Sequence, residues 1–223
     1  MHMLFKTRLI VFLTILAFLT SGYFFWNKPK FEITKQGISR TVVKKSSETS
    51  VGLQVKAEIL KNFTSKNNYN EEICFLINMS IESGKNRFFV YNIKRDSILL
   101  SGLVAHGSCD DGFKTEPTFS NKINSGCSCL GKFKIGNHYT GSFGSAYKLY
   151  GLDSSNSNAF KRNVVLHSYE CVPEQETYPL PICNSLGCPM VSPGFLKQLQ
   201  PIINTSKKPI LLWIYGNEPA KPD

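Results

Sequence analysis

A cysteine that directly follows a glycine is the first feature of this sequence that could do chemistry. Cys188 stands in the segment SLGCPM, which is too rich in turn-forming residues to be a regular helix or strand. We therefore expect a thiol held on an exposed loop. A cysteine is a nucleophile only as the thiolate, so it needs a neighbouring base or cation to lower its pKa from about 8.5.

His167 is the candidate base. It ends the apolar run of residues 164–166, and such a run predicts a strand whose end carries the imidazole to a place where loops gather. The pair can then converge although it is far apart in the chain. In the alternative interpretation, Cys188 is half of a disulfide and His167 is a satisfied surface histidine. Spacing alone does not decide between the two.

Seven cysteines give a second clue to the site. In an exported chain they indicate disulfides, and an odd number leaves at least one thiol unpaired. The six cysteines other than Cys188 permit three bridges in several connectivities, and pairing Cys171 with Cys183 would close a short loop between the candidate base and nucleophile.

A zinc site is the alternative use of these cysteines. Cys127 and Cys129, together with Cys109 and His106, offer four possible ligands. Structural zinc sites usually use the wider Cys-x-x-Cys spacing, and an oxidising compartment favours disulfides. We therefore expect no metal and no cofactor.

The elements that must position these groups are mainly strands. Hydrophobic spacing in residues 51–63 predicts a short amphipathic helix. Three β-prone runs then follow, separated by turn signals, which favours successive antiparallel strands. The sequence thus predicts a mainly β fold with long loops and one or two short helices. The strands are expected at residues 73–81, 87–93, 97–104, 132–135, 145–149, 164–167 and 209–215, and a second helix at 195–203.

The N-terminal region reads as an export or anchoring segment. Lys6 and Arg8 precede an apolar run over residues 9–26, close to the shortest that crosses a hydrocarbon core of roughly 30 Å. We favour an uncleaved membrane anchor, with a cleaved signal peptide as the alternative. Residues 1–26 are thus expected to anchor or export the chain, 27–50 to be a linker, and 51–218 to be the folded domain.

Charge narrows the class of partner. The formal net charge is +10 and the pI is about 9.2, which suits an anionic lipid or an anionic cell-wall polymer. The interleaved basic and aromatic residues of a nucleic-acid module are missing, so no nucleic acid is expected.

Five motifs in order resemble one known family, the L,D-transpeptidase catalytic domains, and specifically its second subfamily. They are AHGSCDDG, FSNKINSGCSCLGKFKIG, YTGSFGSAYKLYGLD, NAFKRNVVLHSYE and SLGCPM, and the resemblance spans roughly residues 75–214. It implies a β-sandwich-like fold and an extracytoplasmic enzyme. In such an enzyme the cysteine attacks the carbonyl after the third residue of a tetrapeptide stem of peptidoglycan and expels the terminal D-alanine.

The resemblance also implies a role for each residue of the site. Cys188 would carry the acyl group, and His167 would take the thiol proton. The backbone carbonyl of Ser168 would orient the imidazole. The backbone N–H groups of Gly187 and Cys188 would form the oxyanion hole, and glycine lets the backbone approach closely.

Substrate binding is where this sequence departs from the family's better-known form. That form often has an arginine soon after the cysteine and a polar residue where Leu186 stands here. Arg162 is the nearest candidate for holding substrate carboxylates, and a solvated loop cation is its alternative reading. His106 and Ser185 are the other residues that we expect to bind substrate.

The sequence therefore predicts a peptidoglycan L,D-transpeptidase in the periplasm or cell envelope, anchored by its N-terminal segment. The alternatives are an L,D-carboxypeptidase or cysteine amidase acting on the same polymer, and a non-catalytic domain that binds the cell wall. Only the acceptor of the acyl group separates the enzymatic alternatives.

Overall fold

The computed structural model describes residues 39–217, with side chains from residue 52 onward. The predicted anchor and the first part of the predicted linker lie outside these residues. Within residues 39–217, no helix has the length and the apolar character that crossing a membrane requires. The division into anchor, linker and domain stays a prediction.

The described chain is mainly β, as predicted. Nine strands join in one sheet in the order β3-β2-β1-β9-β5-β6-β7-β8-β4. The first three strands are antiparallel neighbours, and the closing strand β9 lies centrally, parallel to β1 and antiparallel to β5. The strands are β1 (Ile73–Asn78), β2 (Phe88–Asn92), β3 (Ser97–Gly102), β4 (Val104–Ala105), β5 (Gly131–Gly141), β6 (Gly144–Gly151), β7 (Val165–Ser168), β8 (Met190–Val191) and β9 (Leu211–Tyr215).

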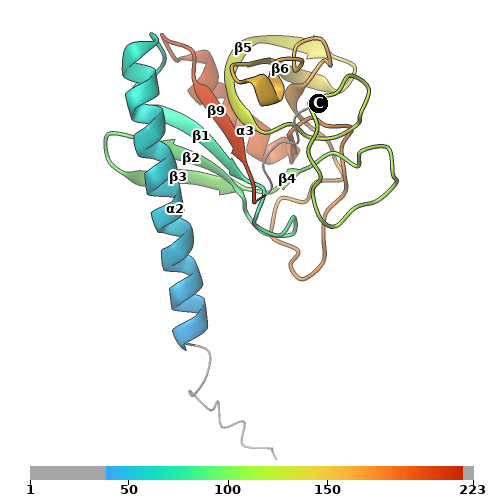
Figure 1. The fold of residues 1–223 in the computed structure, drawn as a ribbon, viewed down its shortest axis with the longest axis horizontal. Coiled ribbons are helices and arrows are strands. Elements are labelled where there is room, and N and C mark those ends of the chain that lie inside the picture. The colour runs from blue at the N-terminus through green and yellow to red at the C-terminus, as the bar shows by residue number, and fades with distance from the viewer. Residues whose placement is uncertain (1–38, 218–223) are drawn as a thin grey trace, which may run out of the picture. The chain divides into compact units, whose positions relative to one another are not determined.

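The two edges of this sheet belong to one stretch of chain. β3 pairs with β2 at one edge, and β4, which follows after Leu103, pairs with β8 at the other. The sheet therefore nearly closes on itself (Figure 1). Hydrogen bonds thus join the strands in one continuous sheet, where the expected sandwich would have two.

Alternation along the strands builds the larger core on the inner face. On β5, Phe133 and Ile135 are buried while Lys132 and Lys134 are only half-buried. Burying a large apolar side chain stabilises a fold by roughly 1.5–3 kcal/mol. The inner core also holds Phe75, Phe88, Tyr147, Leu149, Leu166 and Leu212.

Helix α2 (Ser39–Lys66) covers part of the outer face. Leu53, Ala57 and Leu60 recur at helical spacing and pack against a second core that includes Leu76 and Leu211. The predicted helix is confirmed over residues 51–63, but it begins at Ser39, within the predicted linker. Lengthening a helix costs far less than starting one, so residues without an apolar face can extend a packed helix.

Helix α3 (Pro193–Asn204) confirms the second predicted helix. The side chain of Ser192 accepts a hydrogen bond from the N–H of Phe195, and proline occupies the first turn, where its missing N–H costs nothing. Phe195, Leu196 and Leu199 anchor it to the inner core. A short 3-10 turn, η1 (Ser154–Asn156), precedes the segment that leads into β7.

Candidate active site

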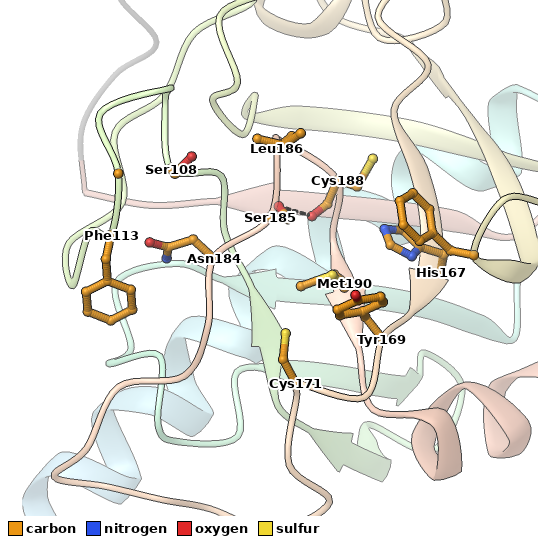
Figure 2. A pocket seen from close by; sticks show the side chains of 12 residues that line it. Ser108, Phe113, His167, Tyr169, Cys171, Asn184, Ser185, Leu186, Cys188 and Met190 are labelled. Atoms are coloured by element: carbon orange, nitrogen blue, oxygen red, sulfur yellow. Dashed lines mark hydrogen bonds between the residues drawn. The ribbon is translucent and has the colours of Figure 1, made fainter.

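Two neighbouring strands bring Cys188 and His167 to the same cleft. β7 carries His167, and β8 begins two residues after Cys188. The strands run parallel with His167 opposite Met190. Both predicted residues line a cleft of about 430 Å³ (Figure 2). Strand pairing therefore brings together residues that are far apart in the chain.

The thiol of Cys188 is free and half-buried. Its sulfur accepts a hydrogen bond from the backbone N–H of Val165 at 3.4 Å and lies 3.7 Å from the backbone oxygen of Asn163, to which it donates. Among the described residues no hydrogen bond joins Cys188 to His167, and Figure 2 shows the sulfur pointing away from the imidazole. Burial raises the pKa of this thiol, while the Val165 N–H and the charges of Arg162 and Lys148 lower it.

The hydrogen bond of His167 fixes its tautomer. Nδ1 lies 3.1 Å from the backbone oxygen of Ser168, and since a carbonyl only accepts, Nδ1 carries the proton. Nε2 is then free to accept one. Burial lowers the pKa of His167 and the bond to Ser168 raises it. The ring stacks on Phe143 at a centroid distance of 5.1 Å.

Ser185 organises the turn that carries Cys188. Its hydroxyl accepts from the N–H of Gly187 at 3.1 Å and donates to the backbone oxygen of Cys188 at 2.7 Å. One of the two expected oxyanion-hole donors is therefore already engaged within the loop. The N–H of Cys188 has no hydrogen-bond partner among the described residues.

Arg162 lies behind the loop and does not line the cleft. Its guanidinium donates to the backbone oxygen of Ser120 at 2.7 Å, to the hydroxyl of Ser125 at 3.2 Å and to the backbone oxygen of Cys127. The side chain is neither a solvated cation nor directed at the cleft. It braces the loop of residues 120–127 against the nucleophile's turn.

His106 is fully buried and does not line the cleft. Its Nδ1 accepts a hydrogen bond from the Arg87 guanidinium at 2.9 Å, and its Nε2 lies 3.2 Å from Nδ2 of Asn184, which does line the cleft. Burial, and then the charge of Arg87, lower the pKa of His106 to about 4. His106 therefore stands behind the cleft wall.

Exposed apolar side chains form much of the cleft, and the sequence did not single them out. Phe143 lies in the turn between β5 and β6, within the motif YTGSFGSAY, so the motif alone could have drawn attention to it. The lining includes no Asp, Glu, Lys or Arg. The apolar residues, with their exposed fractions, are Phe113 (61%), Phe143 (60%), Tyr169 (48%) and Leu186 (77%).

Two disulfides hold the loops around the cleft. Cys171 pairs with Cys183, as predicted, and Cys109 pairs with Cys127. The other two of the six cysteines, Cys74 and Cys129, are free and buried, so two of the three permitted bridges form. The alternative zinc ligands are thereby divided between a disulfide, a buried thiol and a histidine bonded to Arg87.

Solved structures with a similar fold include three proteins of low identity. The Ldtfm–avibactam carbamoyl enzyme is 13% identical (TM-score 0.41), with 67% of this chain and 51% of that one covered. An L,D-transpeptidase from Xylanimonas cellulosilytica is 12% identical (TM-score 0.37), with 65% of this chain and 60% of that one covered. The helical cell shape determining protein Pgp2 from Campylobacter jejuni is 10% identical (TM-score 0.42), with 68% of this chain and 50% of that one covered. The chain spans about half to three fifths of their lengths.

The sequence itself gives a more direct result. No curated protein matches it. The family model of the L,D-transpeptidase catalytic domain matches residues 44–215, which is most of the chain and includes the whole cleft. This protein therefore belongs to the family of L,D-transpeptidase catalytic domains.

Proposed function

We propose that this chain is a peptidoglycan L,D-transpeptidase that forms an acyl-enzyme on Cys188. The observation that carries the proposal is a free, half-exposed thiol in one cleft with a histidine whose Nε2 is held ready to accept a proton. A thiol beside a base oriented by a third group is the arrangement that nucleophilic catalysis needs. Family membership supports peptidoglycan as the substrate.

The proposed reaction begins with a change of rotamer. The thiol donates to the Asn163 carbonyl at rest, so Cys188 must rotate about its Cα–Cβ bond before its proton can pass to Nε2 of His167. The thiolate then attacks the carbonyl carbon after the third residue of a tetrapeptide stem. Collapse of the tetrahedral intermediate breaks the bond to D-alanine, whose amine takes the proton from His167.

The second half of the reaction releases the acyl group. An acceptor amine attacks the thioester and gives up a proton to His167, and Cys188 leaves as the thiolate, which takes that proton back from His167. In both halves the negative oxygen can be bound by the N–H of Cys188, the oxyanion-hole donor that is free in the resting loop, and removing one such donor typically costs on the order of a hundredfold in rate. The N–H of Gly187 joins it only when the bond to Ser185 opens.

The first experiment is intact-mass analysis after incubation with a carbapenem, a β-lactam that resembles the acyl donor. We expect one adduct per chain, none in Cys188→Ala, and slow formation in His167→Gln, which keeps a polar side chain but cannot act as the base. Cys74→Ala is the matched control, because it removes a thiol that is buried in the other core. Wild-type protein that stays unmodified would contradict the proposal.

The acceptor is then identified with a tetrapeptide stem. Release of D-alanine together with a peptide dimer joined through third residues indicates transpeptidation, whereas D-alanine and free tripeptide indicate an L,D-carboxypeptidase. Binding to peptidoglycan without either product, and without the carbapenem adduct, would favour the non-catalytic alternative. An extracytoplasmic location, and the anchor outside the described residues, belong to the same proposal.

A further inference from the structure

The cleft poses a problem for an anionic substrate. Its lining has no charged side chain, and burying a carboxylate without a cation is costly. Arg162 was the expected carboxylate ligand, but its guanidinium donates hydrogen bonds to the loop behind Gly187. A substrate that brings a carboxylate to the thiol needs a cation elsewhere.

Lys148 is a cation on the other side of the thiol. It lies on β6 opposite Val165, the residue whose N–H touches the sulfur of Cys188. Its Nζ lies 3.5 Å from the side-chain oxygen of Asn163, and the backbone oxygen of the same asparagine accepts from the thiol. The charge of Lys148 is also among the influences that lower the pKa of the Cys188 thiol, after burial, which raises it.

Aromatic rings hold this lysine in place. Its Nζ lies 5.0 Å from the ring centroid of Tyr139 and 5.8 Å from that of Phe160. Phe160 stacks on Tyr150 at 5.2 Å with an angle of 12° between the rings, and Lys134 lies 4.7 Å above Tyr150. Ammonium groups over aromatic faces are attracted by the ring quadrupole, so the rings restrict where the lysines can move.

Lys134 places a second ammonium group on the same face. It stands opposite Tyr150 in the β5–β6 register, and Lys148 lies two residues before Tyr150 on β6, opposite the bulge between Ile135 and His138, so the two lysines lie on the same face of the sheet. Neither has an ion pair with any side chain that the structure describes, whereas Lys132 on the same face is bonded to Asp153.

We propose that Lys148 and Lys134 form a carboxylate-binding subsite that adjoins Cys188 on the outer face of β5 and β6. The ligand class is the carboxylate of a peptide, and the identification of that peptide as a peptidoglycan stem rests on the proposed function. The subsite takes the charged end of the substrate, and the uncharged cleft with His167 takes its neutral part.

The subsite can be tested without acyl transfer. Iodoacetate is an anionic alkylating reagent for Cys188, and iodoacetamide is its neutral counterpart of nearly the same size. The ratio of their rates, followed by intact mass, cancels any change in the reactivity of the thiol itself. At an effective dielectric constant of about 20, one charge about 12 Å from an anion changes that anion's local concentration by roughly tenfold.

We expect Lys148→Gln to lower the iodoacetate-to-iodoacetamide ratio by about three- to tenfold, and Lys134→Gln by less. Lys148→Arg, which keeps the charge, should retain the ratio. Lys197→Gln is the matched control, because Lys197 is exposed on α3, outside the cleft lining. A ratio in Lys148→Gln equal to that of wild type would overturn the subsite.

A second readout links the subsite to the substrate. With a stem peptide that ends in a carboxylate, Lys148→Gln should raise KM several-fold, and with the carboxamide analogue it should not. Equal effects on the two peptides would overturn the subsite. Failure of the proposed function looks different, because no carbapenem adduct would then form on wild-type protein while the alkylation ratio still responded to Lys148.

Discussion

At the scale of the residue, backbone groups hold the two reactive side chains apart. The thiol of Cys188 is bonded to Asn163 and Val165, and His167 is bonded to the carbonyl of Ser168. The thiol stays protonated at rest, because burial raises its pKa and no base touches it. Reactivity then depends on a rotamer change that a bound substrate can favour.

Gly187 offers a test of how tightly the nucleophile's turn is built. Its φ is +108°, and a Cβ there would lie 2.6 Å from the backbone oxygen of Cys127. Gly144 has a φ of +78° but open space around the same position. In both alanine variants the free energy of unfolding should fall by about 1–2 kcal/mol, because a Cβ is unfavourable at a positive φ. Only Gly187→Ala also brings its Cβ into a clash with the backbone of Cys127.

The measurement is urea unfolding of the two variants beside wild type. We expect Gly187→Ala to lose at least about 1 kcal/mol more than Gly144→Ala, and to slow alkylation of Cys188 as well. Equal losses would mean that the turn moves away from Cys127 at no cost.

The sequence singled out the candidate pair because a Gly-Cys loop and a histidine after an apolar run are local patterns. The hydrogen bond between His167 and Ser168 is also local, and it is present as the resemblance implied. The bonds of Arg162 are not local. They reach carbonyls 35 and 42 residues away in the chain, so only the fold shows that this arginine braces a loop.

At the scale of the element, a buried polar chain ties the sheet to the cleft. Arg87 precedes β2 and donates to the carbonyl of Val104 in β4 and to Nδ1 of His106, while Nδ2 of Asn184, which donates to the backbone oxygen of Lys114, lies 3.2 Å from Nε2 of His106. Because an arginine only donates, Nδ1 must be an acceptor and His106 must be neutral. Protonating His106 would set two buried cations side by side.

The buried contact between Arg87 and His106 predicts that the free energy of unfolding falls in mild acid. The pKa of His106 is about 4 in the folded protein against about 6.5 when unfolded. Because the unfolded state binds the proton first, the stabilisation is complete above pH 6.5 and is lost as the pH falls toward 4. The loss approaches roughly 3 kcal/mol, and the lowered pKa of His167 adds to it in the same direction.

The measurement is the free energy of unfolding between pH 7.5 and pH 4. This range runs from about one unit above the pKa of histidine in the unfolded chain, about 6.5, down to the pKa of His106 in the folded protein, about 4. His106→Gln can still accept from Arg87 but does not titrate, so it should remove most of the slope. His138→Gln, at an exposed histidine on β5, should keep the wild-type slope. A wild-type slope in His106→Gln would show that other groups carry the acid sensitivity.

Most elements were predictable because they are long enough to show a period. β5 alternates buried and half-buried residues from Gly131 to Ile135, and α3 buries residues at helical spacing. β4 and β8 are two residues each, too short for any period, and their pairing depends on β3 curving back to the far edge. Because β4 and β8 close the sheet beside the site, this closure could not be predicted from the sequence.

At the scale of the whole described domain, two disulfides cross-link the loops that line the cleft. Cys109–Cys127 fastens the loop that carries Phe113, and Cys171–Cys183 joins the segment after His167 to the segment before Cys188. Loops closed over 18 and 12 residues each stabilise a fold by about 3 kcal/mol when the chain-entropy model holds.

This arrangement predicts how many thiols react at each stage of unfolding. All seven cysteines lie within residues 39–217, with four in disulfides and three free. Cys74 and Cys129 are almost fully buried, so the native protein should titrate one thiol, the unfolded protein three and the reduced, unfolded protein seven. Cys188→Ala should remove the native thiol and leave two after unfolding. A native count of zero in wild type would mean that Cys188 is paired or inaccessible. Because no other free cysteine lines the cleft, that result would remove the proposed nucleophile and favour a non-catalytic domain that binds the cell wall.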